Sequence, residues 1–189
     1  MTEPAFQTMG VEEYLRSEET SLMKREYVYG FVYPLHAQAG TTDAHDTIAV
    51  NILTALHGLA RRAGGSVYSS DMRVATQDRH SYSYPDVTVT CEPRDPQARF
   101  KVAPCLLVEV LSKSTAHNDH NGKYHAYTAL PSLHTYLIVE QTEPRVYAYQ
   151  RTPEGWVMTP YGPGESVPLP CIEAELTLET VCGGMDFGT

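Results

Sequence analysis

The stretch CLLVEVL, residues 105–111, predicts a strand at the centre of a sheet. Side chains alternate between the two faces of a strand, so Leu106, Val108 and Val110 would line one face while leucines line the other. A strand that is apolar on both faces is normally covered on both faces. Glu109 stands among the leucines, and a buried carboxylate is costly unless it is paired, hydrogen-bonded or bound to a metal ion.

A second acid stands at the start of another predicted strand. In SYSYPDVTVT, residues 81–90, two valines alternate with two threonines after Pro85 and Asp86, and a period of two is typical of a strand. Proline can begin a strand but does not fit the middle of a hydrogen-bonded ladder. An aspartate after a proline often only caps a turn, so Asp86 alone is weaker evidence for a site than Glu109.

Together, the two acids predict a metal site. Asp86 and Glu109 can meet if their strands are neighbours, and two converging carboxylates suit Mg²⁺, which completes its octahedron with water and substrate phosphate. An ion held there could activate a water molecule and stabilise negative charge on phosphorus. The alternative for Glu109 is a buried ion pair with an arginine or a lysine.

Periodicity and chain breakers predict the elements around these strands. Apolar residues recur at helical spacing from Asp43 to Ala63, before two glycines, which predicts one long helix. The stretch REYVYGFVY, residues 25–33, predicts a strand or a hairpin that turns at Gly30. The other expected elements are a helix at 11–18, a strand at 66–75, a helix at 118–130 and a hairpin of strands at 134–141 and 145–151.

This order of elements predicts an α/β or α+β fold with a mixed central sheet flanked by helices. We expect a single domain over residues 1–189, because the thirteen glycines and thirteen prolines are spread along the chain and mark no linker. We expect no signal sequence and no membrane helix, because no apolar run is long enough. Four separated cysteines without a CxxC pair predict reduced thiols in a cytoplasmic protein.

The formal net charge of -9 bears on the partners of the protein. It disfavours tight non-specific binding to nucleic acid, because such binding normally needs a surface rich in lysine and arginine. It does not exclude a nuclease whose local site is neutralised by metal ions.

An ordered set of motifs resembles the Uma-type family of restriction-endonuclease-like proteins, within the PD-(D/E)xK nuclease superfamily. The motifs are REYVYG at 25–30, His45 at the start of the long helix, YPDVTV at 84–89, LLVEVLSKST at 106–115 and GKYHAYTALPSLHTYLIVE at 122–140. The resemblance implies a nuclease-like core with a divalent ion, Mg²⁺ or Mn²⁺, whose ligands are Asp86, Glu109 and the carbonyl oxygen of Val110. It also implies that Glu26 approaches the site.

The sequence departs from this pattern at three positions. Tyr29 and Phe31 stand where the family commonly has acidic residues, and Leu111 stands where E-x-K requires a lysine. The resemblance implies that the following helix supplies the lysine instead, at Lys123.

Helical spacing supports this placement of the lysine. His120, Lys123, Tyr127 and Leu130 share one helix face, and the apolar members would turn that face towards the protein. The alternatives are that Lys123 is an ordinary lysine at the rim of the protein, or that Lys113 supplies the cation.

Two further residues, His45 and Tyr127, are auxiliary candidates. His45 lies on the apolar side of the long helix, where it is either a proton shuttle or, more commonly, a structural histidine. A zinc site formed by His117, His120 and His125 is disfavoured, because the third histidine leaves the common helix face and no cysteine joins the set. No GxSxG motif supports a small-molecule hydrolase.

We therefore expect a metal-dependent endonuclease that hydrolyses phosphodiester bonds in DNA. Asp86 and Glu109 would hold the ion, Lys123 would orient the attacking water or the phosphate, and Glu26 would be an auxiliary acid. The family likeness also implies a homodimer, since paired sites commonly cut a duplex. The alternative is an inert nuclease fold that serves as a binding module, favoured by the acidic charge and the missing E-x-K lysine. The aromatic-rich strand at 27–33 could stack nucleobases, although packing within a sheet is the commoner use of such residues.

Overall fold

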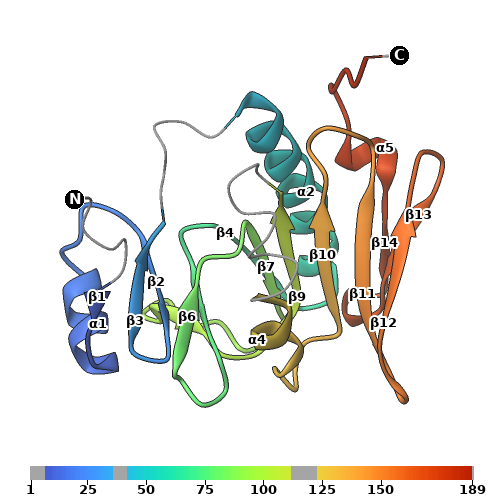
Figure 1. Ribbon diagram of the computed structural model, residues 1–189. Helices are drawn as coiled ribbons and strands as arrows, with labels where there is room; N and C mark the ends of the chain where they lie inside the picture. Colours follow the sequence, from blue (N-terminus) through green and yellow to red (C-terminus); the bar gives the residue numbers. More distant parts are fainter. Residues whose placement is uncertain (1–6, 36–41, 112–122, 189) are drawn as a thin grey trace.

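The computed structural model describes residues 7–35, 42–111 and 123–188 of the chain. It shows a mixed α+β architecture with two six-stranded sheets, a two-stranded sheet and flanking helices (Figure 1). The predicted fold class is therefore confirmed, with two large sheets in place of one. Within the described residues, no helix is long and apolar enough to cross a membrane.

The predicted central strand is confirmed as β9, which lies inside one of the six-stranded sheets and is buried at every residue. It runs antiparallel to β7 on one side and parallel to β10 on the other. The strand order of this sheet is β12 (Gly155–Tyr161), β11 (Val146–Thr152), β10 (Thr135–Val139), β9 (Pro104–Val110), β7 (Val87–Thr90) and β4 (Ser66–Ser69).

The long helix α2 (Asp43–Arg62) covers one face of this sheet, as Figure 1 shows. Its residues Ile48, Ile52, Leu56 and Ala60 are buried at helical spacing against the valines of β7 and β9. The Thr42 side chain caps the helix by accepting a hydrogen bond from a backbone N–H of the first turn. The same core is closed by β13 (Ser166–Leu169), η2 (Pro170–Ile172), β14 (Ala174–Thr177) and α5 (Leu178–Val181).

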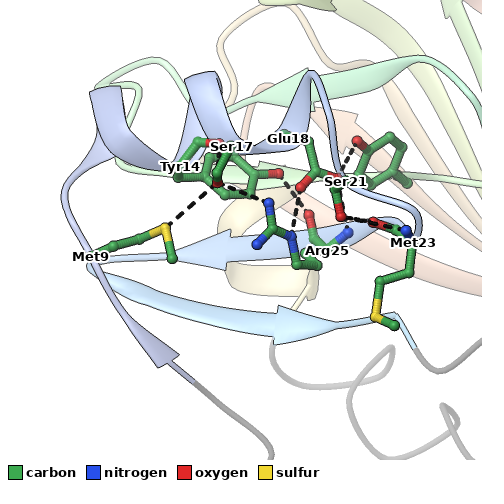
Figure 2. A network of polar contacts seen from close by, with 8 residues as sticks. Met9, Tyr14, Ser17, Glu18, Ser21, Met23 and Arg25 are labelled. Carbon is green, nitrogen blue, oxygen red and sulfur yellow. Dashed lines mark hydrogen bonds and ion pairs between the residues drawn. The ribbon is translucent and has the colours of Figure 1, made fainter.

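The other six-stranded sheet carries the N-terminal helix α1 (Val11–Glu18). Tyr14 of α1 stacks on Tyr27 at a ring distance of 5.0 Å, and its hydroxyl donates to the Arg25 carbonyl at 2.6 Å. Figure 2 shows the polar contacts at this junction, where Glu18 accepts hydrogen bonds from both the backbone N–H and the side chain of Arg25. The strand order is β1 (Gln7–Thr8), β3 (Phe31–Pro34), β2 (Arg25–Val28), β6 (Ser81–Ser83), β5 (Arg73–Ala75) and β8 (Phe100–Lys101).

The predicted strand at 66–75 is wrong as a single element. It divides into β4 and β5, which belong to different sheets, because the polar residues after Ser69 form a turn closed by a hydrogen bond from Met72 N–H to the Ser69 carbonyl. The short strands β6 and β8 were not expected.

The other expected elements are confirmed within the described residues. The stretch at 25–33 is a hairpin turning at Tyr29 and Gly30, and β10 and β11 form the second predicted hairpin. Of the helix expected at 118–130, the structure shows α4 (Tyr124–Thr128), and its earlier part lies outside the described residues. All four cysteines are free thiols.

Gly65 allows the end of α2 to approach β7 closely. A Cβ atom at this position would lie 2.9 Å from the Thr90 carbonyl oxygen and 3.3 Å from that of Ala60, and neither backbone atom can move by a simple rotation. Gly58, inside the same helix, has room for a Cβ, whose nearest neighbour would be an Arg62 side-chain nitrogen at 3.7 Å.

We predict that Gly65→Ala destabilises the protein by about 1–3 kcal/mol, because the added methyl group overpacks the junction between α2 and β7. Gly58→Ala is the matched control, and it should stabilise the protein by about 0.5–1 kcal/mol through helix propensity. Urea denaturation followed by circular dichroism measures both changes. Equal stability of the two variants would show that the close approach at Gly65 does not constrain the fold.

Candidate functional site

Asp86 and Glu109 come from neighbouring strands, as the sequence predicts. Val87 in β7 pairs with Val108 in β9 in antiparallel register, so the next pair in that register is Asp86 with Glu109. Glu109 is only 4% exposed, whereas the Asp86 side chain lies at the mouth of β7 and is 17% exposed. Two acids therefore stand at the same end of two adjacent strands.

Asp86 is fixed by a backbone donor and by a histidine. Its Oδ2 atom accepts a hydrogen bond from the Val110 N–H at 2.7 Å and lies 3.3 Å from His45 Nε2. The hydrogen bond with Asp86 raises the pKa of His45, burial of the ring opposes this shift, and a hydrogen bond to the Val110 backbone adds to it. Both described contacts of Asp86 use the same oxygen, which leaves Oδ1 for another ligand.

Glu109 receives two side chains from the segment that begins at Lys123. Its Oε1 atom lies 3.0 Å from Lys123 Nζ and accepts a hydrogen bond from the Tyr127 hydroxyl at 2.8 Å. Burial raises the pKa of Tyr127 well above its usual value, and the charge of Glu109 raises it further. Tyr127 is therefore a protonated donor at neutral pH, which fixes the orientation of the Glu109 carboxylate.

The other sheet contributes Glu26 from β2. Glu26 Oε1 lies 3.6 Å from Lys123 Nζ and accepts a hydrogen bond from the Tyr84 N–H at 3.3 Å. The Tyr127 hydroxyl also contacts Ser83 Oγ of β6 at 3.0 Å. Lys123 and Tyr127 therefore connect the acid of one sheet with residues of the other, so the site lies where the two sheets meet.

The structure thus brings the sequence-predicted residues into two linked groups. One group contains Asp86, His45 and the Val110 backbone, and the other contains Glu109, Lys123, Tyr127 and Glu26. The two groups are linked because Glu109 and Val110 are successive residues of β9. The roles assigned to them remain predictions, and Lys113, His117 and His120 lie outside the described residues. His125 is exposed, with its ring 5.4 Å from that of Tyr124.

Sequence reasoning missed Ser83 and Tyr84. Ser83 contributes a hydroxyl and Tyr84 a backbone N–H, and a backbone donor leaves no signature in the residue type. The only available signal was position, since both residues stand directly before Pro85 and Asp86.

The donor set suits a hard divalent cation with open coordination positions. Over residues 7–35, 42–111 and 123–188, no three His, Cys, Asp or Glu side chains are grouped as a complete metal site. Mg²⁺ does not require such a cage, because it is commonly bound by one or two carboxylates with water and substrate oxygens in the remaining positions. Asp86 and Glu109, with the Val110 carbonyl nearby, are consistent with that chemistry.

Two related proteins match most of this chain in sequence. An uncharacterized protein of Synechocystis sp. (strain ATCC 27184 / PCC 6803 / Kazusa), slr1290, is 32% identical over 184 residues, which is 96% of this chain and 95% of the relative. A second one from the same organism, sll1609, is 34% identical over 151 residues, or 78% of this chain and 84% of the relative.

A solved structure shares the fold. It is a crystal structure from Anabaena variabilis ATCC 29413 described as "a putative nuclease belonging to DUF820". Its TM-score is 0.73 with 15% sequence identity, and the match covers 92% of this chain and 97% of the other. The family model described as "Uma2: Putative restriction endonuclease" matches residues 11–180. The resemblance expected from the motifs is thereby confirmed, and the chain belongs to the Uma2 family.

Proposed function

We propose that this protein hydrolyses phosphodiester bonds in DNA with the help of a divalent cation, Mg²⁺ or Mn²⁺. The observation that carries the proposal is the pair of acids on adjacent strands, Asp86 and Glu109, with Lys123 3.0 Å from one of them. Membership of the family described as "Putative restriction endonuclease" supports a nuclease-like activity.

In this proposal Asp86 and Glu109 are the ligands of the ion, and the Val110 carbonyl is a third. The bound ion would activate water and neutralise charge that develops on the phosphate. The Val110 N–H and Tyr127 hydroxyl hold one oxygen of each acid, which limits the rotation of both carboxylates. Such preorganisation lowers the cost of assembling the site at the moment of reaction.

Lys123 supplies the second cation of the proposed site. Its ammonium group lies between the carboxylates of Glu26 and Glu109, and its side chain is 16% exposed, so it borders the solvent from which a substrate would arrive. It would orient the phosphate or the attacking water. Glu26 is then an auxiliary acid that positions Lys123, and His45 positions Asp86.

The acidic character of the whole chain is compatible with such a local site. Since the net charge of -9 disfavours a broad basic surface, the proposal assigns the attraction for phosphate to the ion and to Lys123. A homodimer, which the family likeness implies, is also part of the proposal.

One observation favours a second candidate function, an inert nuclease fold that serves as a binding module. The contact of Lys123 with the buried Glu109 is also what a structural ion pair would look like. In that case the two acids would have no reason to bind a cation, so metal binding separates the two readings.

We predict that Lys123→Ala lowers the rate of metal-dependent cleavage about 10²–10³-fold, because it removes one preorganised contact to the reacting group. Cleavage is measured on plasmid and single-stranded DNA at low salt with Mg²⁺, Mn²⁺ or EDTA. Arg99→Ala is the control, because Arg99 is an exposed cation that pairs with Glu19 outside the site. Failure of the wild-type protein to cut any substrate with either metal would favour the binding module.

We predict that Mn²⁺ stabilises the wild-type protein against unfolding but no longer stabilises Asp86→Asn or Glu109→Gln. A ligand present at 100 times its dissociation constant adds about 2.7 kcal/mol to the free energy of unfolding. Both substitutions keep a hydrogen-bonding oxygen, whereas they remove the charge that attracts the ion. Denaturant titrations with Mn²⁺ and with EDTA measure the difference.

The EDTA arm tests the structural alternative for Glu109. If Glu109 serves only to pair with Lys123, Glu109→Gln should lose its cooperative unfolding transition in EDTA, and Mn²⁺ should not stabilise the wild type. Retention of the full Mn²⁺ effect in both variants would remove the two acids from the proposed site.

A further inference from the structure

An exposed aromatic surface lies on the hairpin formed by β2 and β3. One face of this hairpin, with Tyr27 and Val32, is buried against Tyr14 of α1. The opposite face carries Val28, Phe31 and Tyr33, each 41% exposed. We call the surface formed by these three residues the aromatic face, after the rings of Phe31 and Tyr33. Figure 2 shows α1 on the buried side of the hairpin, so this helix does not cover the aromatic face.

The aromatic face is continuous with the candidate site. Tyr33 pairs directly with Glu26 across the two strands, and Val28 pairs directly with Phe31. Directly paired residues lie on the same face of a sheet. Glu26 is 3.6 Å from Lys123, so a strand of substrate at that lysine would reach the two aromatic rings next.

The spacing of the two rings selects the form of nucleic acid. Residues two apart on a strand are about 6.8 Å apart along it, whereas successive bases of one strand in a duplex rise by about 3.4 Å. Phe31 and Tyr33 can therefore each receive the face of a base only if the bases are unstacked. The faces of bases inside a duplex are already covered by their neighbours.

The net charge of the protein does not by itself distinguish single strands from a duplex. Both carry phosphates, and a chain of net charge -9 is poorly suited to phosphate contacts with either form. Stacking on aromatic side chains accepts any base, because every base has a π-face, and it adds binding free energy that an unpaired base can provide at this surface.

We propose that unpaired nucleobases of the substrate stack on Phe31 and Tyr33, with Val28 completing the surface, so that the protein acts on single-stranded or locally unpaired nucleic acid. This inference rests on the proposed function, and it names the substrate class of the same site. Loss of one stacked base corresponds to a loss of about 5- to 150-fold in affinity.

The test is a binding measurement that does not depend on turnover. Fluorescence anisotropy, recorded in EDTA and with Ca²⁺, compares the full chain with a labelled DNA strand of mixed sequence, the same sequence as a duplex, and the corresponding RNA strand. The wild-type protein should bind the single strands more tightly than the duplex. Equal binding of the DNA and RNA strands would support the inference as well, since both expose the same base faces.

The variants Phe31→Val and Tyr33→Val remove the rings and keep a side chain that favours strands. Because both residues also have interactions within the protein, unfolding curves are recorded alongside. Each variant should weaken single-strand binding about 5- to 150-fold, whereas Phe31→Tyr and Tyr33→Phe should retain it. Met158→Ala is the matched control, since Met158 is a 46% exposed apolar residue on β12, in the other six-stranded sheet, and it should change nothing.

The outcomes separate this inference from the proposed function. Single-strand binding that is unchanged in both valine variants overturns the stacking surface, even if cleavage occurs. Binding that depends on Phe31 and Tyr33 without cleavage under any metal supports the surface and overturns the catalysis. If no strand binds and the wild-type protein is a dimer that Phe31→Val makes monomeric, a second copy covers the aromatic face and the inference is wrong.

Discussion

The contact between Glu109 and its partners is the interaction on which the arrangement of the site depends. Glu109 is 4% exposed within a strand whose every residue is buried, and a charge in that position has to be compensated. Lys123 and Tyr127 both reach the same oxygen of the carboxylate. Lys123 in turn contacts Glu26 and Tyr127 contacts Ser83, so one buried charge connects α4 and both six-stranded sheets.

Tyr84 extends this connection to the N-terminal helix. Its N–H donates to Glu26, and its hydroxyl donates to Glu18 of α1 at 2.9 Å. Glu18 also binds Arg25, the residue before Glu26. The polar network of α1 in Figure 2 therefore holds the strand that presents Glu26, and we regard that network as support for the site as well as for the fold.

The sequence predicted the parts of the structure that local patterns determine. A strand apolar on both faces predicted β9, and helical spacing with a glycine stop predicted α2. The inward direction of the Lys123 side chain was predicted from Tyr127, which lies one turn later on the same face of the expected helix. The division of residues 66–75 between two sheets could not be predicted, because a period of two indicates a strand but not the partner of that strand. The contact of His45 with Asp86 likewise depends on how α2 crosses the sheet.

The position of the site at the junction of two sheets has a consequence for when the site is assembled during synthesis and folding. Glu26 leaves the ribosome long before Lys123, and Asp86 and Glu109 come between them. Contacts between such distant positions cost conformational entropy, because the intervening chain has to be closed before they form. The four residues therefore converge only after both sheets have docked, and a nascent or partly folded chain carries these side chains without carrying the site.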